Sequence, residues 1–142
     1  MTSDILSGMN SFATKIMANR AVIYKPATLP EDIERGKLGD CFDHCLLQAA
    51  KNEKYTYVEG YVFSPLRQEW IYHAWLTDGE HAFDPTWRAT NAAGEDVVLF
   101  MMKYIGVPMD TKKTARFVSG TGYKAVFKNY WRDPHLANKI FV

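Results

Sequence analysis

Cys41 is the residue of this chain with the clearest chemical potential, because of its place at the start of a predicted helix. Asp40 is a good N-cap residue, Asp43 lies three positions later as in a capping box, and an apolar pattern continues to Lys51. The spacing therefore predicts a helix that begins at Cys41. A thiol at this position lies near unpaired backbone N–H groups and the positive end of the helix dipole. Both favour a thiolate, and the same N–H groups can stabilise an oxyanion.

A histidine and an aspartate are predicted to meet on a hairpin that follows. Two strand-like runs, residues 69–77 and 80–84, are joined by Asp78-Gly79, a preferred two-residue turn. With these two residues as the turn, His73 lies directly opposite Asp84 on the same face. An imidazole held by a carboxylate forms the second half of a nucleophile–His–acid triad. A bulge of one residue would place the two side chains on opposite faces.

The order of these residues resembles the transglutaminase-like branch of the papain-like cysteine enzymes, including small bacterial and phage proteins of that superfamily. Four blocks between residue 36 and about residue 110 carry the resemblance: Gly39-Asp40-Cys41-Phe42, Tyr57-Val58-Glu59-Gly60-Tyr61, His73-Ala74-Trp75 and Asp84-Pro85-Thr86-Trp87. The resemblance implies that Cys41 is the nucleophile, His73 the general base and acid, and Asp84 the orienting group. It implies acyl transfer through a thioester, without a metal or another cofactor.

Two features depart from that family. Arg35 stands six residues before Cys41, where papain-like peptidases have the glutamine of their oxyanion hole. An oxyanion donor would then come from backbone amides or from a residue that the sequence does not identify. The chain is also much shorter than a eukaryotic transglutaminase, and it has no calcium-site motif.

Each of these residues also has a purely structural interpretation. Cys41 can be a buried thiol, since free cysteines are among the most buried residues. His73 can be a core histidine among its aromatic neighbours, and Asp84 can simply begin an Asp-Pro turn. Their combination favours catalysis. Cys45, one helical turn after Cys41, is expected to pack in the core, with a redox pairing to Cys41 as the alternative.

Metal binding is the main chemical alternative. Cys41, His44, Cys45 and His73 contain the ligand types of a mixed zinc site, but their spacing matches no usual zinc motif, so we expect no metal.

Three aromatic residues are candidates to line the cleft. Trp75 and Trp87 are the expected substrate-binding residues, and Trp87 follows the Asp84-Pro85 pair directly. Tyr61 is better explained as hydrophobic core.

Length and composition are those of one globular domain. The chain has 142 residues, of which 47% are hydrophobic and 23% charged. No apolar run approaches the roughly 20 residues of a membrane-spanning helix, and the N-terminus shows no secretory signal. Two cysteines without such a signal do not suggest a disulfide framework, so we expect a cytoplasmic protein.

The elements that must position the site indicate an α+β fold with a papain-like or transglutaminase-like core. In it, the helix that carries Cys41 packs on a small antiparallel sheet. Residues 1–142 are expected to form one domain, with an N-terminal helix and connector over 1–35, a catalytic core over 36–110, and basic C-terminal strands over 111–142.

Further elements follow from periodicity and from turn residues. Helices are predicted over 4–18 and 95–105, the latter ended by Gly106 and Pro108, and a helical turn over 31–35. Tyr24 to Pro30 is interpreted as a connector. Strands are predicted over 56–64, around Arg116 to Val118, and over Gly122 to Trp131.

Charge is unevenly distributed along the chain. Residues 1–102 hold 9 Lys and Arg against 14 Asp and Glu, whereas residues 103–142 hold 8 against 2. The basic C-terminal region is expected to complement the acidic body of its own chain. An acidic partner or nucleic acid is the alternative, although no nucleic-acid-binding motif accompanies it.

The sequence thus predicts a cysteine-dependent enzyme that attacks an amide or ester carbonyl of a peptide, a protein or a small molecule. Water as the acceptor would make it a peptidase or amidase, and an amine would make it a transglutaminase-like acyltransferase. Hydrolysis is favoured, because water needs no second binding site. The alternative is a non-catalytic interaction protein on the same scaffold, for example a phage-derived one, which binds a host protein or nucleic acid through its basic C-terminal region. Whether residues 1–35 cover the cleft stays open.

Overall fold

The computed structural model describes residues 17–65, 67–87, 89–90, 92–93, 96–97, 102–122, 124–126 and 140. The predicted N-terminal helix lies outside these residues except for its end, where residues 17–20 are helical. Most of the predicted strand from Gly122 to Trp131 also lies outside them.

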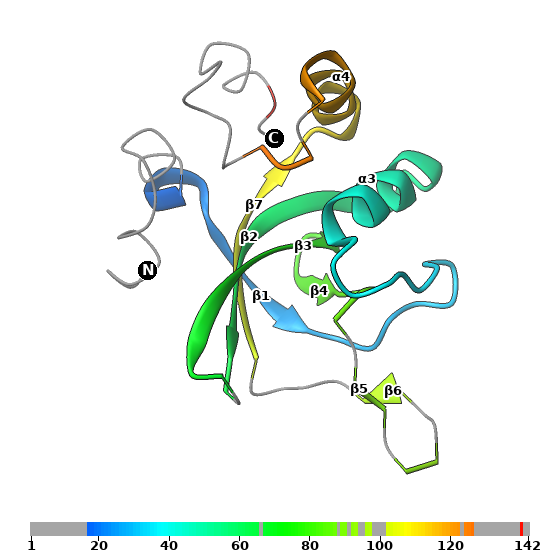
Figure 1. Ribbon diagram of the computed structural model, residues 1–142, viewed down its shortest axis with the longest axis vertical. Coiled ribbons are helices and arrows are strands. Elements are labelled where there is room, and N and C mark those ends of the chain that lie inside the picture. Colours follow the sequence, from blue (N-terminus) through cyan, green and yellow to red (C-terminus); the bar gives the residue numbers. More distant parts are fainter. Residues whose placement is uncertain are drawn as a thin grey trace.

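Five described strands close into a barrel (Figure 1). They are β1 (Val22–Pro26), β2 (Thr56–Ser64), β3 (Glu69–Thr77), β4 (His81–Phe83) and β7 (Lys103–Met109), arranged in the order β1-β4-β3-β2-β7. The neighbouring strands are antiparallel except for β1 and β4. The predicted α+β class is confirmed, but the expected small antiparallel sheet is instead a closed barrel.

The barrel closes through β1, which the sequence analysis interpreted as a connector. β1 pairs with β4 on one side and with β7 on the other. Pro26 suggested a connector, yet it is the last residue of β1, so the strand needs no further N–H from that position. The segment predicted as a helical turn over 31–35 is a turn at residues 31–32 followed by irregular chain.

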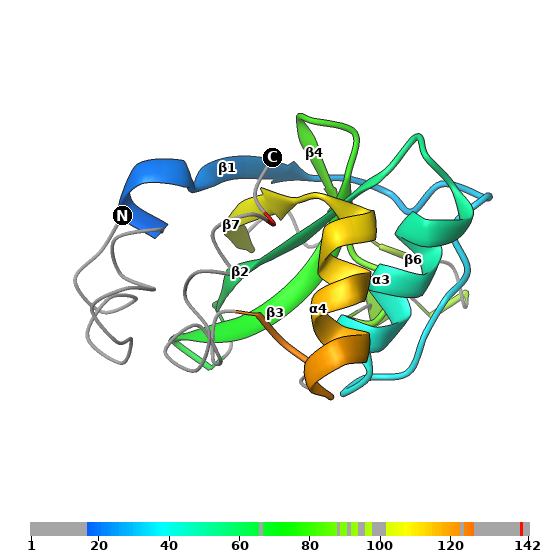
Figure 2. The ribbon, with the colours of Figure 1, turned by 90° about the horizontal axis from the view of Figure 1, so that it is seen from above.

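Two helices lie side by side next to the barrel (Figure 2). α3 (Cys41–Lys51) begins at the predicted residue and packs on β3 and β2. α4 (Thr111–Thr121) occupies the place of the strand predicted around Arg116 to Val118. The side chain of Asp110 accepts a hydrogen bond from the N–H of Lys113 and caps α4, while Gly122, with a φ of 76°, ends it. None of the helices in the described part of the chain has the length and apolar character needed to cross a membrane.

The prediction of a helix over residues 95–105 is wrong. β6 (Asp96–Val97) pairs with β5 (Ala89–Thr90) in a separate small sheet, and β7 begins at Lys103. Pro108 fits in β7 because β1 pairs with β7 only as far as Gly106, so that beyond this point β7 has β2 as its one neighbour in the barrel.

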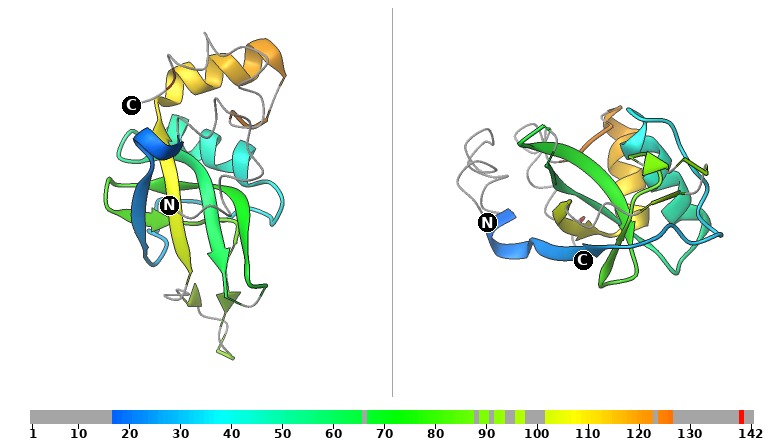
Figure 3. Two further views of the ribbon diagram at one scale, coloured as in Figure 1. Left: turned by 90° about the vertical axis from the view of Figure 1, so that its left-hand side faces the viewer. Right: turned by 90° about the horizontal axis from the view of Figure 1, so that it is seen from below.

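The barrel strands separate two hydrophobic clusters. Trp75 and Tyr104 belong to the cluster inside the barrel, together with Val58, Val62 and other residues. The alternate residues of β3, Ala74 and Leu76, belong to the cluster that packs under α3 and α4. Figure 3 shows α4 across one end of the strands, in the left-hand view.

Two glycines allow the barrel to close tightly, and we expect substitution there to be destabilising. Gly60 of β2 lies opposite Gly106 of β7. A Cβ at Gly60 would lie 2.2 Å from the backbone oxygen of Ile105 and 2.3 Å from the Cα of Gly106. Because these atoms are backbone, Gly60→Ala is expected to lower the free energy of unfolding by about 2–3 kcal/mol, measured by urea denaturation.

Gly120→Ala is the matched control. Gly120 lies within α4, and a Cβ there would meet nothing within 4 Å. The variant is expected to gain about 0.5–1 kcal/mol from the higher helix propensity of alanine. Equal destabilisation of both variants would contradict the tight approach of β2 and β7.

Candidate active site

The short β4 leaves an open edge on β3, and the site forms beside it. β4 pairs with β3 only at Leu76 and Thr77. The chain then turns away at Asp84-Pro85, where proline has no N–H for a ladder. The Sγ of Cys45 lies 3.6 Å from the backbone oxygen of Ala74, so α3 lies against this edge of β3.

His73 and Asp84 meet as predicted, but through a different register. Thr77 pairs with Ala82, so four residues separate this innermost pair where the sequence predicted a two-residue turn, and the last of the four, His81, already belongs to β4. The Asp78 side chain stabilises this loop by accepting hydrogen bonds from the N–H groups of residues 80 and 81, at 3.0 and 2.9 Å. A register shift of two residues leaves each side chain on the same face of the sheet. Asp84 is therefore a diagonal neighbour of His73, with Oδ2 2.9 Å from Nε2.

Asp84 is held by hydrogen bonds to both carboxylate oxygens. Oδ1 accepts from the N–H groups of Thr86 and Trp87, at 3.3 and 3.0 Å. Oδ2 accepts a hydrogen bond from the Tyr104 hydroxyl at 2.8 Å, in addition to its contact with His73. Burial and the Asp84 charge raise the pKa of Tyr104 well above its ordinary value, so the hydroxyl stays a donor. The orienting carboxylate is thus fixed in position.

His73 is buried between Asp84 and Cys41. Burial by itself lowers the pKa of an imidazole, but the charge and hydrogen bond of Asp84 and the contact with Cys41 outweigh it and raise the pKa of His73 to about 10. Trp87 packs edge-on against the imidazole, with ring centroids 5.6 Å apart. The site therefore stabilises an imidazolium next to a thiol.

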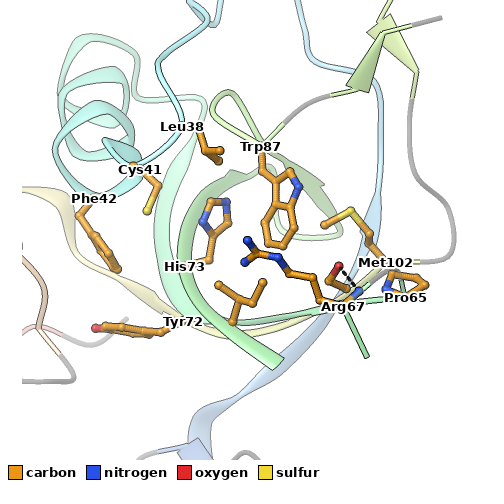
Figure 4. A pocket seen from close by; sticks show the side chains of 12 residues that line it. Leu38, Cys41, Phe42, Pro65, Arg67, Tyr72, His73, Trp87 and Met102 are labelled. Atoms are coloured by element: carbon orange, nitrogen blue, oxygen red, sulfur yellow. Dashed lines mark hydrogen bonds between the residues drawn. The ribbon is translucent and has the colours of Figure 1, made fainter. Parts of the chain in front are cut away.

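Cys41 lies at the start of α3, and Figure 4 shows its side chain beside His73. Because Nε2 of His73 binds Asp84, Nδ1 is the ring nitrogen that can meet the thiol. The expected capping box is wrong: the Asp40 side chain makes no cap hydrogen bond. The N–H groups of the first turn of α3 therefore have no side-chain cap from Asp40.

The loop before α3 ties Cys41 to the turn that carries Asp84. The N–H of Gly36 donates to the backbone oxygen of Pro85 at 3.0 Å. Two residues earlier in the loop, the backbone oxygen of Glu34 lies 2.6 Å from Nε2 of His44 in α3. His44 is thus engaged in this loop, away from the zinc set considered above.

Cys45, another residue of the zinc set considered above, also has a structural explanation. Cys45 is fully buried, and burial, together with the charges of Asp84 and Cys41, raises the pKa of its thiol well above the ordinary value. Both cysteines are free. Among the described residues, no three His, Cys, Asp or Glu side chains are arranged to hold a metal ion.

Cys41 and His73 open into a pocket of about 680 Å³ (Figure 4). Trp87 lines it, as expected for a substrate-binding residue. Trp75 does not belong to this lining: its side chain is fully buried inside the barrel, packed against Tyr104 and over Gly106. The expectation that Trp75 contacts substrate is therefore wrong.

Sequence reasoning missed much of the pocket wall and its support. Most of the missed lining residues are apolar or aromatic, and one is an arginine: Leu38, Phe42, Ile71, Tyr72, Met102 and Arg67. Tyr104 was missed because it was assigned to a helix. The aromatic and β-branched residues Tyr104, Ile105 and Val107 were the available signal for a strand.

Removing the Tyr104 hydroxyl is expected to slow chemistry at Cys41. Tyr104→Phe deletes one donor to Asp84, and a hydrogen bond to a charged group contributes about 1.5–3 kcal/mol. We expect the rate of Cys41 acylation to fall about 10-fold or more. Tyr24→Phe is the control, because Tyr24 packs edge-on against Trp75 as Tyr104 does. An equal effect of both variants would contradict a specific role of Tyr104.

The pKa of His73 predicts how stability depends on pH. The imidazole has a pKa of about 10 in the folded protein and an ordinary value of 6.5, so the folded state holds a proton that the unfolded state releases. This stabilisation is complete below pH 6.5 and is lost as the pH rises through 10. Urea midpoints should therefore fall over this range more steeply in the wild type than in His73→Gln. His81→Gln should keep the wild-type slope, and equal slopes in all three proteins would contradict the raised pKa.

Comparison with protein-family models, with curated proteins and with solved structures finds no match for this chain.

Proposed function

We propose that this protein is a cysteine-dependent acyl-transfer enzyme with Cys41, His73 and Asp84 as its triad. The observation that carries the proposal is the placement of His73 between a buried carboxylate, at 2.9 Å, and a thiol at the start of a helix, at the base of a pocket. These are the parts that nucleophilic catalysis requires: a nucleophile, a base and an orienting group.

The reaction follows from these positions. The Cys41 sulfur attacks an amide or ester carbonyl as a thiolate, paired with the His73 imidazolium. The tetrahedral intermediate collapses as the bond to the leaving amine or alcohol breaks, and His73 gives that group its proton. Water, or an amine, then attacks the resulting thioester while His73 accepts the proton of the acceptor. Release of the acid or the new amide expels the thiolate and restores its pair with the His73 imidazolium.

Backbone N–H groups at the start of α3 are suited to stabilise the oxyanion. The side chain of Asp40 does not cap them, and they lie next to the attacking sulfur. A pair of such donors can supply several kcal/mol of transition-state stabilisation, on the order of the 2.7–4 kcal/mol reported for one oxyanion-hole donor. No glutamine before Cys41 is then needed, which accommodates the arginine at position 35.

The proposal includes a papain-like or transglutaminase-like core. A cysteine that starts a helix, a histidine on a strand and an aspartate after the next strand occur here in the order that this resemblance implies. We favour hydrolysis over transfer to an amine, since water needs no separate site, and we place the reaction in the cytoplasm, where thiols stay reduced.

Acylation by a p-nitrophenyl ester tests the proposal. We expect a burst of p-nitrophenolate and an acyl group located on Cys41 by peptide mass spectrometry. Cys41→Ala should abolish both, and Cys45→Ala, the matched control one helical turn away, should retain both. Addition of an amine then shows whether the acyl group passes to water or to the amine. Acylation elsewhere, or equal turnover in Cys41→Ala, would contradict the proposal.

A second candidate function rests on the surface of α4. Lys112, Lys113 and Arg116 are exposed on α4, whereas Thr114 and Phe117 are buried. Such a cluster is suited to an acidic protein or a nucleic acid. Binding that weakens steeply with salt, and is lost when the three cations are replaced by glutamine but kept in Cys41→Ala, would favour this function.

A further inference from the structure

The pocket is apolar over most of its wall but carries a cation on the side opposite Cys41. Figure 4 shows Arg67 beside Pro65 and Met102, facing the side formed by Phe42 and Cys41. Among the described residues of the lining, Arg67 alone has a permanent positive charge. A ligand that fills this pocket therefore meets an aromatic and aliphatic wall and, at one end, a guanidinium group.

A structured turn between β2 and β3 holds Arg67 at the rim. The N–H of Arg67 lies 3.4 Å from the side-chain Oγ of Ser64. The N–H of Gln68 donates to the backbone oxygen of Ser64 at 2.8 Å. The Gln68 side chain also donates to the backbone oxygen of Pro65 at 2.6 Å. Gln68 has a φ of 54°, a left-handed conformation that residues other than glycine adopt at a cost. The turn thus fixes the backbone from which Arg67 extends.

The Arg67 guanidinium has capacity for a ligand. Nη1 lies 3.7 Å from Oε1 of Glu69, and the two side chains are 65% and 55% exposed. An exposed pair of this kind is weak. A guanidinium has five N–H donors in a fork that matches a carboxylate or a phosphate, so Arg67 can bind an anion alongside Glu69.

We infer that the preferred acyl donor has an apolar body and ends in an anionic group, a carboxylate or a phosphate. The body packs against Ile71 and Trp87, the anion binds Arg67, and the carbonyl lies at Cys41. This inference rests on the proposed function, in which Cys41 attacks that carbonyl. It adds the class of substrate that the attack selects.

Alkylation by three iodoacetamides of equal chain length, ending in a methyl, a carboxylate or a phosphonate, tests the inference. Rates at Cys41 are read by peptide mass spectrometry and divided by the rates of the same probes with glutathione. We expect the anionic probes to exceed the methyl probe by about 10-fold or more, as a charge-assisted hydrogen bond provides. The better of the two anionic probes identifies the anion. The methyl probe should in turn exceed iodoacetamide itself, because of the apolar wall.

Substitutions at Arg67 decide the origin of this preference. Arg67→Gln should remove it, and Arg67→Lys, which keeps the charge without the fork, should retain part of it. Lys103→Gln is the control, because Lys103 is an exposed cation outside the pocket lining, and it should keep the full preference. A preference that is absent in the wild type, or that persists in Arg67→Gln, overturns the inference.

The same data separate this inference from the proposed function, because iodoacetamides alkylate any accessible thiol. A slow Cys41 that still prefers the anionic probes supports the Arg67 site and contradicts an activated nucleophile. A fast Cys41 without that preference supports the activated nucleophile and overturns the substrate class.

Discussion

Replacing His73 with alanine is expected to lower the rate of Cys41 acylation by about 10²–10⁴-fold, the range for loss of a general acid–base group. His73 contacts both Asp84, at 2.9 Å, and Cys41. Without it, the thiolate loses its imidazolium partner, and the leaving group loses its proton donor. The measurement is the single-turnover rate of p-nitrophenolate release.

His81→Ala is the matched control for this prediction. His81 lies on the same hairpin, with Nδ1 2.9 Å from Oδ2 of Asp78 and its ring stacked on Phe83. It is expected to keep the wild-type rate within about 2-fold, since surface substitutions of this kind change stability little. A His73→Ala protein that acylates as fast as His81→Ala would exclude His73 as the base.

Replacing Glu59 with alanine is expected to destabilise the fold by about 3–6 kcal/mol. Glu59 is fully buried in β2, and its carboxylate accepts hydrogen bonds from the hydroxyls of Tyr57 and Tyr72, at 2.7 and 2.5 Å. The N–H of Val126 lies 2.9 and 3.0 Å from its two oxygens. Alanine would remove the acceptor of two buried donors, the Tyr57 hydroxyl and the Val126 N–H, at about 1–3 kcal/mol each, and that of the half-buried Tyr72 hydroxyl. This loss is a large fraction of the roughly 5–15 kcal/mol that stabilises domains of this kind.

Urea denaturation measures this effect, with Glu69→Ala as the control. Glu69 has a side chain that is 55% exposed, so its loss is expected to change stability by less than about 0.5 kcal/mol. Tyr72 lines the pocket and packs on Phe42 with ring centroids 5.0 Å apart, so Glu59 also supports the wall next to Cys41. A Glu59→Ala protein as stable as Glu69→Ala would contradict the buried network.

The parts of the fold that local sequence determines were predictable. α3 begins at Cys41, and β2 and β3 have the predicted bounds, because a helix start and alternating apolar strands are properties of neighbouring residues. β1, β7 and α4 were missed because Pro26, Pro108 and Gly120 resemble boundaries. Whether a proline or a glycine ends an element depends on its partner strands and on its caps, which the pattern of one segment does not contain.

The candidate site also has a part that local sequence determines and a part that depends on distant strands. The meeting of His73 and Asp84 followed from the face of each side chain, which survived an error of two residues in register. Tyr104 reaches Asp84 only because β7 closes the barrel, so nothing local to the hairpin indicates it. Trp75 is buried in the barrel rather than in the pocket, because Gly106 leaves room for its ring there.

The rate of Cys41 alkylation as a function of pH, in the wild type and in His73→Ala, tests the central claim most directly. Cys45 is the internal control in every sample, since it is fully buried and burial raises the pKa of its thiol. The account predicts that Cys41 is alkylated much faster than the cysteine of an unstructured peptide under the same conditions, and that this reactivity is lost in His73→Ala. A Cys41 that reacts no faster than the peptide cysteine and is unaffected by the loss of His73 would contradict it.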